Sequence, residues 1–96
     1  MAAYRLSDAA LADLDRIYEY GVLSFGLKQA DDYYDGLVCQ FQKVADMPLS
    51  YPAVDEIRAG YRRATYNSNS IFYRIKGQVV EIVRILGREN GLRIFS

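Results

Sequence analysis

Residues 71–86 of this chain read IFYRIKGQVVEIVRIL, and this stretch decides the fold. Two runs rich in Ile, Val, Phe and Tyr flank the pair Lys76-Gly77. Glycine takes the positive φ that a tight two-residue turn needs, so an X-Gly pair between apolar runs is typical of a hairpin. The stretch therefore predicts a β-hairpin that closes on Lys76-Gly77 and sets Tyr73 opposite Val80.

Side chains alternate along a strand, so this register assigns each hairpin residue to one of two faces. Arg74 and Glu81 become diagonal neighbours, close enough for an ion pair. The first face is mostly apolar and is the expected core face; it holds Ile71, Tyr73, Ile75, Gln78, Val80, Ile82, Arg84 and Leu86. The second face is mixed and holds Phe72, Arg74, Val79, Glu81, Val83 and Ile85.

The second face adds apolar surface through Phe72, Val83 and Ile85, and this surface has two interpretations. These residues are ordinary strand formers that the protein's own tail covers, or they form a surface that a partner covers. The second interpretation draws on the observation that exposed apolar patches usually mark interaction sites.

The rest of the chain predicts two helices and two more strands. A strand over residues 3–6 precedes an amphipathic helix over about residues 8–24, with Ser7 as N-cap and Gly26 at its end. A second helix over about residues 28–46 completes an antiparallel helical hairpin. A strand begins near Gly60, and residues 67–69 turn the chain into the 71–86 hairpin.

The resulting order, β-α-α-β-β-β, predicts an α+β domain in which a two-helix hairpin packs on one face of a small antiparallel sheet. The first strand is expected at a sheet edge, and the face away from the helices is expected to stay at least partly open. Phe41, Tyr73 and Ile82 are expected in the core. Gly36, in mid-helix, suggests close approach of a neighbouring helix or strand.

Two helix residues receive specific assignments. Asp13 falls away from the apolar stripe of the first helix, on its solvent side. Cys39 falls beside the stripe of the second helix and is expected to be a packed thiol rather than a nucleophile, because the chain has no histidine to activate it.

The composition indicates one globular domain over residues 1–96, with 51% hydrophobic and 25% charged residues. No run approaches the roughly 20 apolar residues of a membrane span. The N-terminus, MAAYRLSD, lacks signal-peptide character, and a single cysteine permits no intramolecular disulfide. A cytoplasmic protein without membrane association is therefore expected.

Charge is distributed unevenly along the chain although the total is zero. Residues 1–57 hold ten acidic and four basic side chains, whereas residues 58–96 hold eight basic and two acidic ones, giving −6 and +6. Either the second part binds an acidic partner, or the two parts neutralise each other within the domain. A pI near 6.2 argues against direct nucleic-acid binding.

Catalytic motifs are scarce in this sequence. Without histidine, neither a Ser-His nor a Cys-His arrangement can form, and no metal-ligand motif or phosphate loop is present, so no cofactor is expected. Several arginines belong to the predicted sheet or its ends. They could bind phosphate or carboxylate, or stabilise a phosphoryl transition state, but solvated strand ends explain them equally well; they are Arg62, Arg63, Arg74, Arg84 and Arg88.

Three segments in combination resemble the ParE branch of the RelE/ParE toxin superfamily. They are YRLSDAALADLDRIYEY, FGLKQADDYYDGL and DEIRAGYRRATYNSNSIFYRIKGQVVEIVRIL, which together span residues 4–86 and leave 87–96 as a tail. The resemblance implies a toxin of a type II toxin–antitoxin pair, with a helical hairpin on a small antiparallel sheet. It also implies that the toxin inhibits DNA gyrase by protein contact and is neutralised by a small, partly disordered antitoxin.

The RelE branch, which cuts messenger RNA on the ribosome, is the rival. When the segment FYRI is aligned with its counterpart in the RelE branch, Ser70 stands where an arginine of that branch is expected. Several nucleases of the RelE branch also use a histidine, which this chain lacks. The tail also departs from the ParE pattern, because Gly87-Arg88-Glu89-Asn90 replaces a histidine-containing segment. Three functions therefore stay open: a non-enzymatic gyrase inhibitor, a ribosome-dependent endoribonuclease, and a toxin-fold protein that binds antitoxin without a target.

The resemblance also leads to two predicted surfaces. The antitoxin is expected to bind the basic second part, on the open sheet face and an adjacent edge, through Phe72, Arg74, Val83 and Ile85. A target-binding or basic patch is expected at Arg62, Arg63, Arg84 and Arg88.

Overall fold

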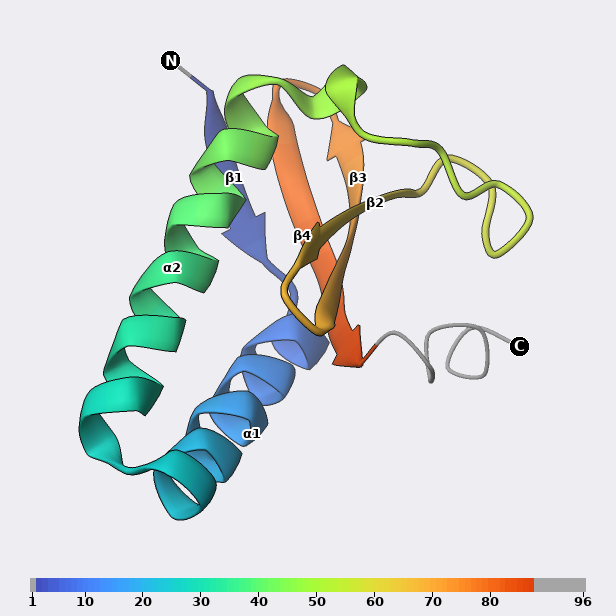
Figure 1. Ribbon diagram of the computed structural model, residues 1–96. Coiled ribbons are helices and arrows are strands. Elements are labelled where there is room, and N and C mark those ends of the chain that lie inside the picture. The colour runs from blue at the N-terminus through green and yellow to red at the C-terminus, as the bar shows by residue number, and fades with distance from the viewer. Residues whose placement is uncertain (1, 88–96) are drawn as a thin grey trace.

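The computed structural model describes residues 2–87, and its two long helices lie where the sequence predicts them. α1 spans Asp8–Phe25 and α2 spans Leu27–Asp46. Ser7 Oγ accepts a hydrogen bond from the Ala10 amide at 3.1 Å and so caps α1. Gly26, with φ 91°, separates the helices, and this positive φ suits a glycine. In Figure 1 both helices lie on the same side of the sheet.

The sheet has four strands in the order β1-β4-β3-β2. These are β1 (Ala3–Leu6), β2 (Arg62–Tyr66), β3 (Asn69–Lys76) and β4 (Val79–Gly87). The first strand lies at an edge, as predicted, but it pairs parallel to β4, whereas the other pairs are antiparallel. The predicted α+β class and element order are confirmed, and the sheet is mixed rather than wholly antiparallel.

The main core lies between the helices and the sheet. Phe41, Tyr73 and Ile82 are at most 1% exposed, as predicted. The other fully buried residues of this core come from both helices and from β2, β3 and β4. They include Ala10, Leu37, Val44, Ala64, Ile71 and Ile85. In α1 the expected stripe is only partly buried: Leu14 is in the core, but Leu11 and Phe25 are 49% and 60% exposed.

The register of the 71–86 hairpin differs from the prediction. Lys76 pairs with Val79, so the turn residues are Gly77-Gln78 rather than Lys76-Gly77. Gly77 has φ 65°, and Asn67 is the one non-glycine residue with positive φ among residues 2–87. A turn on Lys76-Gly77 of type I′ would force Lys76 to positive φ, whereas glycine at the first turn position fits type II′. As a result, Arg74 lies directly opposite Glu81 rather than diagonal to it.

A β-bulge then shifts the pairing once more. Tyr73 pairs with Ile82 but Phe72 pairs with Arg84, so Val83 is the extra residue on β4. The bulge reverses the alternation beyond it. Ile85, predicted on the second face, joins the main core, and Leu86, predicted on the core face, joins the cluster on the opposite side of the sheet.

The face away from the helices is partly covered by the chain between α2 and β2. A short 3₁₀ helix, η1 (Pro48–Ser50), is followed by a loop that reaches β2 (Figure 1). The loop is fixed by a hydrogen bond from the Val54 amide to the Tyr61 carbonyl at 2.8 Å. Val54 and Tyr61 pack with Phe72 and Leu86 in a second hydrophobic cluster. This loop therefore covers Phe72, which was expected to be covered by the protein's own tail or by a partner.

Two helix positions test the expectations for α2. At Gly36, a Cβ would overlap the Tyr66 hydroxyl and lie 2.7 Å from Tyr66 Cζ, which confirms the expected close approach of a strand. Cys39 is exposed, so the expectation of a packed thiol is wrong. Within residues 2–87, no helix combines the length and the apolar character that crossing a membrane requires.

Candidate functional site

A row of three charged side chains crosses the sheet on the face away from the helices. Arg5, Glu81 and Arg74 occupy directly paired positions on β1, β4 and β3. Arg74 Nε donates to Glu81 Oε1 at 2.7 Å, and Arg5 Nη2 lies 3.7 Å from Glu81 Oε2. The hydrogen bond from Arg74 lowers the pKa of Glu81 and raises that of Arg74. Two cations share one carboxylate here, so the row keeps a net positive charge on this face.

The residues predicted to bind the antitoxin do not form one open patch. Phe72 and Ile85 are both 0% exposed, and they belong to clusters on opposite sides of the sheet. The expectation that they leave open apolar surface is therefore wrong. Phe72 is covered by the loop before β2, and the bulge turns Ile85 toward the helices. Arg74 and Val83 keep partial exposure on β3 and β4.

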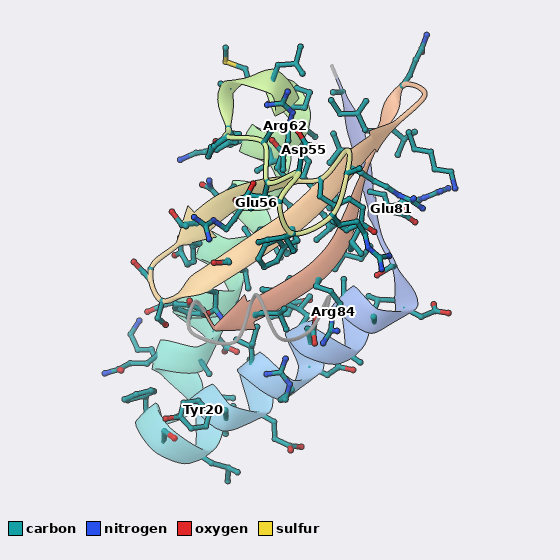
Figure 2. The ribbon with its side chains drawn as sticks, turned by 90° about the vertical axis from the view of Figure 1, so that its right-hand side faces the viewer. Tyr20, Asp55, Glu56, Arg62, Glu81 and Arg84 are labelled. Atoms are coloured by element: carbon teal, nitrogen blue, oxygen red, sulfur yellow. The ribbon has the colours of Figure 1, made fainter. Side chains whose placement is uncertain are left out.

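The arginines predicted as a basic patch have separate roles. Arg84 Nε donates to Asp13 Oδ2 at 2.7 Å, and Arg62 Nη1 donates to the Tyr51 carbonyl at 2.6 Å. Figure 2 shows Arg62 and Arg84 well apart on this side of the molecule. Arg63 is half-buried on β2 opposite Phe72, and Arg88 lies outside the described residues. The structure thus commits two of these four arginines to internal contacts.

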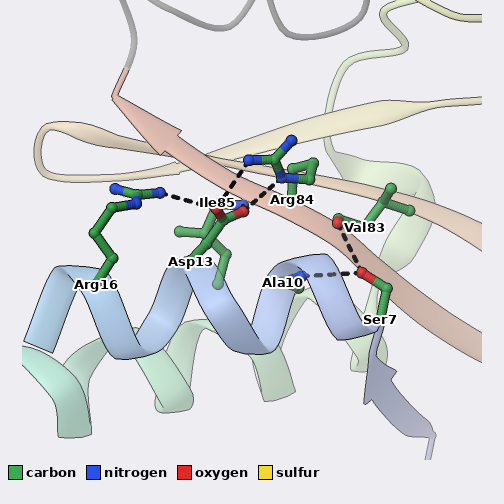
Figure 3. A network of polar contacts seen from close by, with 7 residues as sticks. All are labelled: Ser7, Ala10, Asp13, Arg16, Val83, Arg84 and Ile85. Carbon is green, nitrogen blue, oxygen red and sulfur yellow. Dashed lines mark hydrogen bonds and ion pairs between the residues drawn. The ribbon is translucent and has the colours of Figure 1, made fainter.

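Asp13 is the polar residue that the sequence analysis misplaced, because it is 3% exposed rather than on the solvent side. Its carboxylate accepts hydrogen bonds from Arg84 Nε at 2.7 Å, Arg84 Nη2 at 2.9 Å, Arg16 Nη2 at 2.8 Å and the Ile85 amide at 2.9 Å (Figure 3). Burial raises the pKa of Asp13, but the hydrogen bonds from Arg84, the Ile85 amide and Arg16 outweigh it and leave the pKa below its usual value.

This network fixes the β-bulge onto α1. The bulge leaves backbone groups of β4 without hydrogen-bond partners on the neighbouring strand. Asp13 of α1 and the N-cap residue Ser7 supply hydrogen bonds in their place. Ser7 Oγ donates to the Val83 carbonyl at 2.8 Å, while Asp13 accepts from the Ile85 amide (Figure 3). The prediction that Arg84 lies on the core face is also wrong, because the bulge pairs Arg84 with Phe72 on the opposite face. The sequence spacing therefore held no reliable signal for the contact between Asp13 and Arg84.

Ser70, the position that bears on a RelE-type nuclease activity, is also buried. Ser70 is 0% exposed, and its hydroxyl has no hydrogen-bond partner among the residues that the structure describes. It stands where the RelE-type arginine was expected. Among residues 2–87, no group of three or more His, Cys, Asp or Glu side chains is arranged to hold a metal ion.

Comparison with known proteins adds the family. The family model described as "ParE toxin of type II toxin-antitoxin system, parDE" matches residues 4–91. The chain belongs to the ParE toxin family. It is 40% identical over 93 residues to Toxin ParE1 of Caulobacter vibrioides, covering 97% of this chain and 96% of that protein. It is 37% identical over 84 residues to Toxin ParE1 of Mycobacterium tuberculosis, covering 86% of each chain.

Solved structures agree with the ParE assignment at the level of fold. A chain of the chromosomal ParDE toxin–antitoxin system from P. aeruginosa superimposes with a TM-score of 0.79 at 26% identity, covering 91% of this chain and 96% of that chain. A chain of the RelBE2 toxin–antitoxin complex from Mycobacterium tuberculosis superimposes with a TM-score of 0.60 at 20% identity and shares the fold alone. The predicted ParE-type toxin of a type II system is thereby confirmed.

Proposed function

We propose that this chain inhibits DNA gyrase by protein–protein contact in the cytoplasm and is neutralised by a small cognate antitoxin. The observation that carries the proposal is the match to the ParE family across residues 4–91, with 40% identity to a ParE1 toxin over nearly the full length of both chains. The complexes among its structural neighbours support an antitoxin partner.

The rival function is ribosome-dependent cleavage of messenger RNA, because one structural neighbour is a RelBE complex. Three features favour gyrase inhibition over cleavage. Ser70, the position of the expected nuclease arginine, is buried, and Arg84 is bound to Asp13 rather than open to a phosphate. The chain also lacks histidine as an acid–base group.

A paired assay separates these functions. Purified protein is added to gyrase with relaxed plasmid, and separately to translating ribosomes with a defined message. We expect loss of supercoiling with the message intact. Codon-phased cleavage of the message with normal supercoiling would instead establish the nuclease function, and inactivity in both assays would leave a protein that binds antitoxin only.

For the antitoxin we propose the sheet face that carries the Arg5–Glu81–Arg74 row, with Val83 as the adjacent apolar contact. Residues 58–96 carry +6, and the row leaves one cation in excess. An acidic segment is attracted to such a surface, and β1 and β2 offer sheet edges beside it. Phe72 and Ile85 are fully buried and are not part of this surface.

Binding kinetics test the antitoxin surface. Arg5→Glu is the sharper variant, because the Arg5 side chain is 54% exposed and its contact with Glu81 is long, whereas Arg74 is hydrogen-bonded to Glu81. We expect slower association with the cognate antitoxin, to be sought as the product of the neighbouring gene, and a weaker salt dependence. Lys28→Glu, on the helical hairpin, is the charge-matched control. Equal association rates for both variants would place the antitoxin elsewhere.

A further inference from the structure

The end of the helical hairpin exposes an unusual amount of apolar surface. Tyr20, Leu23, Phe25 and Leu27 are 64%, 82%, 60% and 61% exposed, and they surround the passage from α1 to α2. The Tyr20 and Phe25 rings meet edge to face with centroids 6.3 Å apart. Figure 2 places Tyr20 at the far end of α1 from Glu81 and Arg62. Contiguous apolar patches of this kind mark interaction sites in soluble proteins.

A groove of about 270 Å³ adjoins this patch. Its walls come from α1, α2 and the turn between β2 and β3, and Tyr20 and Phe25 line it together with Leu14 and Leu37. Leu14 and Leu37 belong to the main core and are 6% and 0% exposed. A side chain inserted here would therefore contact the hydrophobic core itself, which gives an apolar anchor a large gain on burial.

A second hollow of similar volume lies beside the groove and has a different chemistry. It is lined by Asp15, Tyr18, Asp31 and Tyr34, and both tyrosines also line the groove. The two rings meet edge to face at 5.7 Å, and the Tyr18 hydroxyl donates to Asp31 Oδ1 at 2.6 Å. Aromatic rings beside carboxylates attract a guanidinium or an ammonium group.

The charge of the hairpin agrees with that chemistry. Residues 8–46 hold eight acidic and three basic side chains, a net charge of −5. A partner for this surface must therefore combine apolar side chains with at least one arginine or lysine. An acidic segment, which suits the Arg5–Glu81–Arg74 row on the opposite side of the sheet, would be repelled here.

We propose that this hairpin groove is where the toxin contacts its target, and that the target supplies an amphipathic segment with apolar side chains next to a cation. The apolar side chains enter the groove, and the cation lies at Tyr18 and Tyr34 between Asp15 and Asp31. The assignment to the target rather than the antitoxin rests on the proposed gyrase function and on the opposite charge of the two surfaces.

The test measures equilibrium binding of the full chain to assembled gyrase, and in parallel to the neighbouring gene's product. Tyr20→Asp and Phe25→Asp should each weaken gyrase binding at least tenfold, because both side chains line the groove and a charge would replace an apolar contact. Leu49→Asp is the matched control, since Leu49 is 70% exposed but lies on η1, away from the groove. All three side chains are exposed, so melting temperatures should stay close to the parent's.

A second pair of variants tests the cation. Asp15→Asn should weaken gyrase binding several-fold and reduce its salt dependence. Asp32→Asn is its control, because Asp32 pairs with Lys28 in solvent and lines neither hollow. Antitoxin binding should be unchanged in every variant.

The outcomes are distinguishable. Parent protein that fails to bind gyrase overturns the proposed function and this inference together. Parent binding that Tyr20→Asp and Phe25→Asp leave intact overturns the inference alone. Loss of antitoxin binding in these variants assigns the groove to the antitoxin, and a parent dimer that Phe25→Asp makes monomeric assigns the groove to a second copy; both results overturn the inference.

Discussion

At the scale of single residues, the most consequential group is the buried Asp13 carboxylate. It joins α1 to the bulge of β4 through Arg84 and the Ile85 amide. Asp13→Asn leaves the Arg84 guanidinium without a counter-charge, and removing one partner of a buried pair costs about 3–5 kcal/mol. We expect a loss of that order in the free energy of unfolding, measured by urea denaturation. Arg16→Ala is the control, because Arg16 is 58% exposed and should cost little.

The same carboxylate predicts a pH dependence. Its folded-state pKa lies below the ordinary value of 3.8, so its contribution to stability is complete above that value and is lost as the pH falls through the folded pKa. The difference in unfolding free energy between the parent and Asp13→Asn should therefore be constant near neutral pH and shrink below about pH 4. A difference that grows on acidification would contradict the hydrogen-bonded carboxylate.

Gly36 supplies a second prediction at this scale. Alanine in an exposed helix usually gains about 1 kcal/mol over glycine, but here its Cβ would overlap Tyr66. Gly36→Ala should instead lower the unfolding free energy by about 1–3 kcal/mol, as overpacking does. In a Tyr66→Ala background the same change should become stabilising. A double-mutant cycle measures this coupling, and additive effects would show that the two residues do not touch.

At the scale of elements, the turn between β3 and β4 requires glycine because of its backbone conformation and not because of steric crowding. Gly77 has φ 65°, and a Cβ built there meets nothing within 4 Å. Gly77→Ala should cost about 1–2 kcal/mol, the penalty for an L-residue in left-handed space. Gln78→Ala, at the neighbouring turn position, should be nearly neutral. Thermal melts compare the two variants, and equal losses would contradict a requirement for glycine that is specific to position 77.

The elements also explain which parts of the structure the sequence could predict. Both helices and all four strands follow from periodicity, caps and turn residues, which are local signals. The register error came from choosing the second turn position for Gly77, and the bulge at Val83 left no local signal at all. The bulge is held by hydrogen bonds to Asp13 of α1 and to the N-cap residue Ser7, and both residues are distant from Val83 in sequence. The burial of Phe72 depended in turn on a loop whose path no periodicity encodes.

At the scale of the whole molecule, charge separates two surfaces on opposite sides of the sheet. The helical hairpin carries −5, and the opposite face carries the Arg5–Glu81–Arg74 row. The hairpin belongs to the acidic first part of the sequence, whereas Glu81 and Arg74 of the row come from the basic second part and Arg5 from the first. The hairpin groove could not be predicted, because its walls come from α1, α2 and the turn between β2 and β3, which only the packing of these elements brings together. A protein with two surfaces of opposite charge can engage two chemically different partners.

The most direct measurement is the supercoiling of a reporter plasmid in cells after brief expression of this chain, with and without the neighbouring gene. Negative supercoiling should fall before protein synthesis declines, and the neighbouring gene's product should restore it. Synthesis that stops first while supercoiling stays normal would contradict gyrase as the target and return the chain to the ribosome-directed branch of its superfamily.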